Sequence, residues 1–595
     1  MSGKTFAEKI LNADSGSIVF AEPDIVLTHD NTASIAQTFK KMNADPAAKV
    51  HDPDQLMIVL DHNAPPTSAK LATQYQNIRD IVKEYRVDRF HDVGSGICHQ
   101  LMSYHAKPGM IIVGSDSHTC TAGAFNALAA GIDRTESAGL WKRGETWFRV
   151  PDTLKIVLNG KLRENVYAKD ISLWIIGMIG SAGANYMSIE YHGLGIKTLS
   201  VSDRMTIANL ASEMGAKNAV FPPDEVLAEF YGKDTIEGVW ADEDAVYLKE
   251  IQINLDEIVP MTAAPHQVDN VKTVEEVEGL ELNQALIGTC TNGRLEDLRI
   301  AAEILDGKQI PAGFQLLIAP ASKEIYLQAI EEGIISKFIS AGANILGASC
   351  GPCLGTGQGI PADGHRVIST ANRNFLGRMG NKKAEIYLAS PATVAISALN
   401  GKITVPGEKT NKIFPYSKEK STTVEIADDD NRRVEGVWNY ADTDDLNTDL
   451  MFAGNLTYNV LSSDAEAIMP HLFAGFDPNF SANVKKDDVL IAGDNFGCGS
   501  SREHPAVGLA HAGVKAVIVK SVNRIFFRSS VNQGLPIIIL PEAVESYKQG
   551  DKVTIDFTKG SVSVGNKTLE FAPLPDKLMG IFKAKGLVNF IKNQG

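Results

Sequence analysis

Short runs of β-branched and apolar residues alternate with helical segments along this chain, and this alternation limits its fold more than any other feature. The runs include residues 56–60, 110–113, 315–318, 514–520 and 536–540. Such alternation is typical of α/β layers with mostly parallel sheets. Glycine-rich turns follow several runs, and open α/β sheets usually bind ligands at the ends of their strands. We therefore expect functional side chains in the loops that follow the strands.

The chain has 595 residues, too many for one hydrophobic core, so we expect several domains. The clearest break lies between Gly401 and Gly436, where a lysine-rich segment precedes an acidic one. Weaker breaks lie near Pro151 and near residues 251–261. The predicted divisions are three α/β domains at 1–152, 153–255 and 256–404, a linker at 405–438, and a further α/β domain at 439–595.

The charge and the cysteine usage exclude some classes of function. The net charge is −15, which repels nucleic acids and anionic membranes, so a small anionic substrate would need a locally basic pocket. Six cysteines without a disulfide framework fit a reducing compartment. The N-terminus lacks the apolar segment of a signal peptide, and no run of about twenty apolar residues could span a membrane. We therefore expect a cytoplasmic protein with no membrane partner.

Three cysteines stand in small-residue loops that suggest a metal centre. Cys290 lies in Gly-Thr-Cys-Thr-Asn, and Cys350 and Cys353 lie in Ser-Cys-Gly-Pro-Cys. Three thiolates can hold a [4Fe–4S] cluster and leave one iron open as a Lewis acid. From the spacing alone, structural zinc, a redox pair and buried thiols remain alternatives. Cys98, Cys120 and Cys498 lie far away in the sequence, among other motifs.

Residues 491–505 predict a strand that runs into a small-residue loop and then opens a helix. Backbone N–H groups of such a loop, together with Arg502, would form a cradle for an anion. Neighbouring positive dipoles could stabilise a serine alkoxide there, so that the serine acts as a base. A phosphate-binding glycine loop with serine helix caps is the alternative.

Carboxylates and imidazoles occur together after two other predicted strands. Asp61 and His62 follow residues 57–60, and Asp116 and His118 follow residues 111–113. Such pairs fix a histidine tautomer and tune a proton donor, although either pair alone would more often be a capped turn. Further candidates are His29, His99, Asn209, Glu213, Arg373 and Arg378. Asn209 and Glu213 are predicted to share one helix face, and the planar arginine forks suit carboxylates.

The joint order of these motifs resembles the aconitase superfamily of iron–sulfur hydro-lyases over nearly the whole chain. The matching motifs are Gly114–Thr119, Ile287–Asn292, Cys350–Cys353, Asn372–Phe375 and Gly499–His504. The resemblance implies three α/β domains around a [4Fe–4S] cluster and a swivelling C-terminal α/β domain, joined by a linker, that closes over it. Cys290, Cys350 and Cys353 would hold the cluster, which purified protein could contain as [3Fe–4S] or have lost.

The same resemblance implies that the protein removes water from a hydroxy polycarboxylic acid and adds it back. Ser500 would take the proton as an alkoxide, and His62, paired with Asp61, would protonate the departing hydroxyl. Supporting carboxylate–imidazole pairs would be His99, Asp116, His118 and Glu213, and residues near the cluster would be Asn209, Asn292 and Asn372. Substrate-binding residues would be His29, Ser117, Arg373, Arg378, Ser501 and Arg502.

The identity of the acid is predicted from the features that separate the subfamilies. A histidine at position 29 is similar to isopropylmalate isomerases. The segment Glu190–Gly193 is similar to aconitases, and so is the presence of the cluster-binding domains and the C-terminal domain in one chain. The loop at 450–460, where the family reads the variable substituent, contains no arginine. A third carboxylate buried there without a cation would be costly, so we expect a substrate of the isopropylmalate or alkylmalate type.

Two other functions remain as alternatives. The first is hydration of aconitate or homoaconitate, and the remote second is RNA binding by the cluster-free form, which the net charge of −15 disfavours. We expect a monomer, although the sequence does not determine the oligomeric state.

Overall fold

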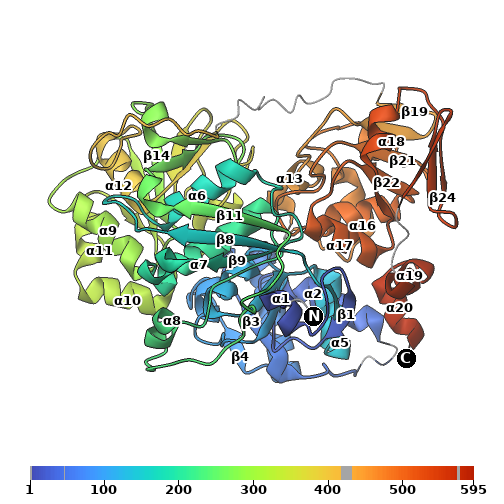
Figure 1. The fold of residues 1–595 in the computed structure, drawn as a ribbon, viewed down its shortest axis with the longest axis horizontal. Coiled ribbons are helices and arrows are strands. Elements are labelled where there is room, and N and C mark those ends of the chain that lie inside the picture. The colour runs from blue at the N-terminus through green and yellow to red at the C-terminus, as the bar shows by residue number, and fades with distance from the viewer. Residues whose placement is uncertain are drawn as a thin grey trace.

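The structure is a computed structural model of the chain, and it describes residues 3–43, 45, 47–416, 432–457, 459–571 and 576–594. Residues 417–431, in the predicted linker, lie outside this range. Figure 1 shows a larger N-terminal body with a smaller C-terminal part beside it. Both contain mostly parallel sheets with helices against them, so the predicted α/β fold class is confirmed.

The first sheet has five parallel strands in the order β4-β3-β2-β5-β6. Its strands are β2 (Ile25–Thr28), β3 (Leu56–Val59), β4 (Arg89–His91), β5 (Ile111–Gly114) and β6 (Leu128–Gly131). Its helices are α1 (Phe6–Ile10), α2 (Thr32–Met42), α3 (Ala69–Tyr85), α4 (Cys98–Met102) and α5 (Arg134–Arg143), and β1 (Ile18–Ala21) pairs with β7 (Thr146–Arg149). Because the strand order reverses between β2 and β5, the loops after these strands border a crevice.

The second sheet has four parallel strands in the order β10-β9-β8-β11. They are β8 (Thr153–Asn159), β9 (Ser188–His192), β10 (Asn218–Val220) and β11 (Lys249–Asn254), with helices α6 (Ala168–Ile179), α7 (Val201–Leu210) and α8 (Glu225–Phe230). Asp170 in the first turn of α6 accepts the backbone N–H groups of Tyr167 and Met261. Because Met261 begins a strand of the third sheet, this carboxylate ties α6 to that sheet.

The third sheet has seven strands in the order β13-β12-β18-β17-β14-β15-β16. They are β12 (Met261–Ala263), β13 (Val271–Thr273), β14 (Gln284–Gly288), β15 (Gln315–Ala319), β16 (Asn344–Ile345), β17 (Arg366–Ser369) and β18 (Glu385–Ala389). Its helices are α9 (Leu295–Leu305), α10 (Lys323–Glu331), α11 (Ile334–Ser340) and α12 (Pro391–Asn400). Strands β14 to β18 are parallel, and their order reverses at β14, which lies between β15 and β17. The third sheet therefore has its own crevice at the carboxyl end of β14.

The C-terminal part contains a fourth sheet in the order β19-β20-β21-β22-β23. Its strands are β19 (Arg433–Val434), β20 (Val437–Tyr440), β21 (Val489–Ala492), β22 (Ala516–Val519) and β23 (Ile537–Ile539). Its helices are α13 (Thr448–Met451), α14 (Ala465–Ile468), α15 (Phe480–Asn483), α16 (His504–His511), α17 (Arg524–Gln533) and α18 (Pro541–Ser546). A three-stranded antiparallel sheet follows, formed by β24 (Val553–Asp556), β25 (Ser561–Val564) and β26 (Lys567–Glu570).

The last two helices, α19 (Asp576–Lys583) and α20 (Leu587–Gln594), pack against the body and not only against the C-terminal part. Leu587 and Ile591 are buried in one hydrophobic core with Trp141 of α5, and Figure 1 shows α20 close to α5. This contact attaches α20 to helices of the first sheet.

Separate hydrophobic cores support the division into a body and a C-terminal part. One core runs through the second and third sheets and one face of the first sheet, whereas the fourth sheet has cores of its own. The predicted domain boundaries stay a prediction, and β19 begins inside the predicted linker. No helix in the described part of the chain has the length and apolar character needed to cross a membrane.

Candidate active site

One pocket between the body and the C-terminal part gathers most of the predicted site residues. Those that line it are His29, His62, His99, Asp116, Ser117, His118, Cys290, Cys350, Cys353, Asn372, Arg373, Arg378, Ser500, Ser501 and Arg502. They follow β2, β3, β4 and β5 of the first sheet, β14, β16 and β17 of the third, and β21 of the fourth. Strand ends of three sheets therefore face one cavity, as the sequence pattern predicted.

The cysteines reach this pocket from two loops of the third sheet. Cys290 follows β14 at the reversal of strand order. Cys350 directly precedes a short 3-10 turn after β16, and Cys353 lies within that turn. Gly288, at the end of β14, has a φ of +144°, and a Cβ there would lie 2.3 Å from the carbonyl oxygen of Ala319. Only glycine can therefore bring this loop so close to β15.

The surroundings of the three sulfur atoms fit bound thiolates. The amides of Asn209 and Asn372 donate to Cys290 Sγ over 3.4 and 3.2 Å, and the guanidinium of Arg378 lies 3.5 Å from Cys353 Sγ. None of the three cysteines forms a disulfide. Burial raises the pKa of the Cys290 thiol to about 12, so binding of a metal would displace protons from these groups. Three cysteines at one pocket, two of them with N–H donors at the sulfur atom, suit an iron–sulfur cluster.

His62 is held by two carboxylates. Its Nδ1 lies 2.6 Å from Asp61 Oδ1, and its Nε2 lies 3.5 Å from Asp116 Oδ2. Burial would raise the pKa of Asp61, but the charge and hydrogen bond of His62 keep it below its usual value. Because an ionised carboxylate only accepts hydrogen bonds, Nδ1 carries a proton and Nε2 faces the pocket. The ring also stacks on that of His29, with 4.0 Å between the centroids.

Asp30, which the sequence analysis missed, holds the loop under His62. Its carboxylate accepts the backbone N–H groups of Asp61, His62 and Asn63 over 3.0, 3.2 and 2.7 Å. Burial raises the pKa of Asp30. Although its position directly after His29 could have marked it, its partners lie in a loop about thirty residues away, so the sequence alone did not indicate this contact.

A second chain of carboxylates and imidazoles crosses the pocket wall. Asp116 Oδ1 lies 2.8 Å from His99 Nε2, and His118 Nε2 lies 2.7 Å from Glu213 Oε1. Glu213 in turn pairs with Arg373 over 2.9 Å. Burial would raise the pKa of Asp116, but hydrogen bonds with His118, His62 and His99 hold it well below its usual value. The pocket therefore keeps fixed negative charges behind its histidines.

Three arginines donate to one hydroxyl. Ser500 Oγ lies 3.1 Å from Arg378 Nη1, 3.3 Å from Arg373 Nη1 and 3.5 Å from Arg502 Nη2. Arginine has no acceptor, so the serine oxygen accepts all three hydrogen bonds. Asp449, at 2.5 Å from Arg502, balances one of these charges. Burial would lower the pKa of Arg378, but Cys353 and Asp449 raise it above its ordinary value.

Four predicted site residues do not line the pocket: Asp61, Asn209, Glu213 and Asn292. The first three contact residues that do line it, through the bonds given above. Asn292 is different, because its amide donates to Asp297 over 2.9 Å and to Thr206 over 3.4 Å. It therefore braces the start of α9.

Asn209 and Glu213 do not share a helix face, so that prediction was wrong. Helix α7 ends at Leu210, and Glu213 lies in a 3-10 turn from Ala211 to Met214. The tighter turn changes the angle between successive side chains. Asn209 therefore points to Cys290, while Glu213 points to His118 and Arg373.

Several lining residues were not predicted: Asn31, Ile97, Cys98, Ser115, Arg134, Leu354, Gly454 and Thr457. Cys98 donates its backbone N–H to Asp61 Oδ2 over 2.7 Å. Gly454 and Thr457 belong to the loop at 450–460, in which Tyr458 and the side chain of Asn455 lie outside the described residues. No sequence signal marked Arg134, because only the packing of α5 turns it toward the pocket.

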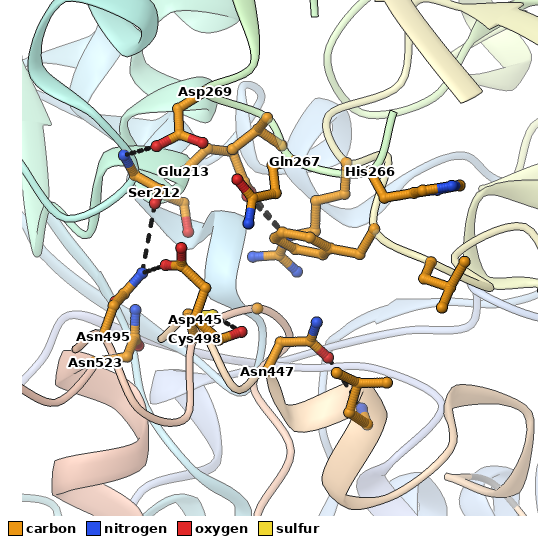
Figure 2. Close-up of a pocket in the computed structure, with 17 residues that line it drawn as sticks. Ser212, Glu213, His266, Gln267, Asp269, Asp445, Asn447, Asn495, Cys498 and Asn523 are labelled. Carbon is orange, nitrogen blue, oxygen red and sulfur yellow. Dashed lines mark hydrogen bonds and ion pairs between the residues drawn. The ribbon is translucent and has the colours of Figure 1, made fainter. Parts of the chain in front are cut away.

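A second pocket lies on the other side of Arg373 and Glu213 (Figure 2). There Asn495 donates to Asp445 over 2.8 Å and to Ser181 Oγ over 3.4 Å, and Asp269 accepts the backbone N–H of Ser181 over 3.1 Å. These bonds join the C-terminal part to the body. Carboxylates in this wall disfavour an anionic substrate, so the first pocket is the better candidate for the active site.

Comparisons with known proteins found similar sequences over most of the chain. Residues 4–401 match the aconitase family (aconitate hydratase), and residues 464–542 match the aconitase C-terminal domain. The "3-isopropylmalate dehydratase large subunit 1" of Methanopyrus kandleri is 44% identical over 68% of this chain and 99% of its own length. The "Methanogen homoaconitase large subunit" of Methanocaldococcus jannaschii is 43% identical over 67% and 99%. A crystal structure of 3-isopropylmalate dehydratase from the latter organism is 39% identical over 25% of this chain and 89% of its own, with a TM-score of 0.24.

Proposed function

Because this chain belongs to the aconitase family and is therefore a hydro-lyase, we propose that it isomerises a hydroxy acid with a malate core, through an unsaturated intermediate. The observation that carries this proposal is the convergence of three arginines on Ser500 in the pocket that the three cysteines line. A base, carboxylate-binding cations and metal ligands are the parts that such a reaction needs.

Family membership implies an iron–sulfur cluster, and we propose that it is of the [4Fe–4S] type. Cys290, Cys350 and Cys353 would hold it, with Asn209, Asn372 and Arg378 donating to their sulfur atoms. When bound, such a cluster supplies an open iron that acts as a Lewis acid on the carbon–oxygen bond of the substrate hydroxyl.

Ser500 is the proposed base. An opposite charge within about 4–6 Å favours the ionised form of an acid, and three guanidinium groups donate to this hydroxyl. The alkoxide takes the proton from the carbon next to a carboxylate, and the electrons of that C–H bond form the carbon–carbon double bond. Rehydration returns this proton from Ser500 Oγ to the intermediate.

His62 is the proposed acid at the other end of the eliminated water. Its Nε2 faces the pocket while Asp61 holds Nδ1, so a proton on Nε2 can pass to the departing hydroxyl and complete a water molecule. His62 recovers that proton from water during rehydration. Proton loss to Ser500 and proton gain from His62 balance the elimination.

The substrate carboxylates would bind to Arg373, Arg378 and Arg502, with His29, Ser117 and Ser501 near them. In the loop at 450–460, Gly454 and Thr457 line the pocket and neither carries a charge. An apolar substituent suits such a wall, because a carboxylate without a cationic partner is costly to bury. An isopropylmalate or alkylmalate is therefore the preferred substrate, and dehydratase relatives carry such a name.

One observation favours a second candidate, an aconitate or homoaconitate hydratase. Arg134 lines the pocket from the first turn of α5 and is only 4% exposed. Its charge acts on His29 and on His504, and His504 Nε2 lies 2.9 Å from the carbonyl oxygen of Val460 in the substituent-reading loop. Arg134 therefore lies on the side of the pocket where a third carboxylate would bind.

A substrate panel distinguishes the two candidates. Anaerobically reconstituted protein is assayed by ultraviolet absorbance with alkylmaleates, cis-aconitate and cis-homoaconitate. Faster turnover of alkylmaleates supports the preferred substrate, and faster turnover of the tricarboxylic acids supports the second candidate. If the tricarboxylic acids are turned over faster, Arg134→Leu should lower kcat/KM for those acids by a factor that corresponds to a loss of about 2–5 kcal/mol in binding free energy. Failure to turn over any of them with the cluster present would refute the proposed function.

The oligomeric state is a separate question. The relatives are named large subunits, which favours an assembly of more than one chain over the monomer expected from the sequence. This chain, however, also matches the aconitase C-terminal domain at 464–542. Sedimentation analysis of the purified protein measures which state it adopts.

A further inference from the structure

Lys169, the second residue of α6, is a lysine with no exposed surface. Its Nζ donates to the carbonyl oxygens of Thr370 and Ala371 over 2.9 and 2.6 Å. A buried ammonium group is costly unless hydrogen bonds and opposite charges compensate it. No carboxylate of the described residues lies within ion-pair distance of this Nζ. The neighbouring Asp170 bonds backbone N–H groups of Tyr167 and Met261.

The two carbonyl groups belong to the loop that enters the active site. They directly precede Asn372, which donates to Cys290 Sγ over 3.2 Å, and Arg373, which donates to Ser500 Oγ over 3.3 Å. Lys169 itself comes from α6 of the second sheet, so it supports this loop from behind. Its hydrogen bonds therefore help to set where one cluster-side amide and one substrate-side guanidinium lie.

Two of the four groups whose negative charge would act on Lys169 are proposed cluster ligands. Burial lowers its pKa to about 7, and the groups that oppose this change are, in order, Cys290, Glu213, Cys353 and Asp297. Glu213 is already paired with Arg373 and His118, and Asp297 with Asn292. Three thiolates around a [4Fe–4S]²⁺ core leave a net negative charge, which would keep this lysine protonated.

We propose that Lys169 is a positioning residue that holds the Asn372–Arg373 loop and supplies a fixed positive charge behind the cluster. The inference rests on the proposed cluster. A cation in a low-dielectric interior stabilises added electrons, so it raises the reduction potential of the cluster. It also lowers the tendency of the cluster to be oxidised and lost.

The test compares reconstituted holoenzymes by redox titration, followed by electron paramagnetic resonance of the reduced cluster. Lys169→Met and Lys169→Gln remove the charge, and Lys169→Arg keeps it. We expect both neutral variants to shift the reduction equilibrium about tenfold, which is about 59 mV lower for one electron. Bleaching of the visible absorbance in air should also become faster.

Lys217→Met is the matched control. Lys217 is 3% exposed and donates to the carbonyl oxygen of Arg149 over 3.0 Å, which lies outside the Asn372–Arg373 loop that Lys169 supports. Its variant loses a buried lysine in the same way, so we expect an unchanged potential even if the melting temperature falls. A matching shift in Lys217→Met would show that the effect comes from general loosening and would overturn the proposal.

The remaining outcomes are also decisive. A wild-type potential in the neutral variants overturns the proposal, as does failure of all three Lys169 variants, arginine included, to fold. Assembly of a cluster in Lys169→Arg but in neither neutral variant supports it. If the wild-type protein itself assembles no cluster, the proposed function fails, and this failure is distinguishable from that of the Lys169 proposal.

Discussion

Replacing Ser500 with alanine removes the oxygen on which three arginines converge. The change leaves the rest of the loop in place, because the Ser500 carbonyl still accepts Thr448 Oγ1 over 3.0 Å and the N–H of Arg502 over 2.7 Å. Arg373, Arg378 and Arg502 also keep their contacts with Glu213, Cys353 and Asp449. The fold and the cysteine loops should therefore be unaffected.

The size of the effect follows from the role of the lost group. A positioned base contributes about 10²–10⁴ in rate, and each tenfold step is about 1.36 kcal/mol. Because three cations at 3.1, 3.3 and 3.5 Å stabilise the same alkoxide, we expect the upper end of this range. Ser500→Ala should lower kcat by about 10⁴, or about 5.4 kcal/mol.

The assay follows the unsaturated acid by ultraviolet absorbance, and the visible absorbance of the cluster is recorded on the same samples. Ser501→Ala is the control, since Ser501 Oγ donates to the carbonyl oxygen of Ile132 over 3.2 Å. We expect it to lose less than about tenfold. The reasoning is refuted if Ser500→Ala keeps more than about a tenth of the wild-type kcat, or if it loses activity only because it has lost the cluster.

Three other predictions concern the cluster and stability. Cys350→Ser should lose bound iron and activity together, as measured by iron and sulfide content; full retention of iron would contradict its role as a ligand. Burial, then Glu503 and Glu136, raise the pKa of Asp133 well above its usual value. Because the pKa of Asp133 is higher in the folded state than in the unfolded state, the stability of the fold falls as the pH rises from about 3.9, the pKa in the unfolded chain, through the pKa in the folded protein. Asp133→Asn should therefore raise the melting temperature more at pH 8 than at pH 5, whereas an equal gain at both would refute this. Asn532 Oδ1, which lacks a partner among the described residues, can accept the new amide. Ile591 of α20 is 3% exposed and shares a core with Trp141 of α5, so Ile591→Ala should lower the free energy of unfolding by about 2–5 kcal/mol without changing kcat/KM well below the melting temperature. A negligible change in the melting temperature would contradict the packing of α20 against α5.

Much of the fold was predictable because it depends on local patterns. The five apolar runs correspond to β3, β5, β15, β22 and β23. Strand spacing and apolar character are properties of short segments, so they can be read along the chain. The prediction that Asn209 and Glu213 share one helix face was wrong, because α7 ends at Leu210 and a 3-10 turn begins at Ala211.

The candidate site could be predicted where the residues that bond each other are adjacent in the sequence. Asp61 and His62 are adjacent in the chain and bond each other over 2.6 Å. Partners of the other site residues come from distant segments. Asp30 meets the His62 loop only after β2 and β3 have paired, and Glu213 meets both His118 and Arg373 only after separate sheets have packed together.

The sequence by itself determined the class of chemistry, because the cysteine loops, the serine loop and the carboxylate–imidazole pairs follow one another in the order that is typical of aconitase-family hydro-lyases, although each motif alone allows other functions. Only the tertiary structure decided which charges surround that chemistry. Arg134 enters the pocket from α5, and Lys169 reaches behind the Asn372–Arg373 loop from α6. The physical reason is that both positions depend on how one sheet packs against another, and no spacing along the chain encodes that contact.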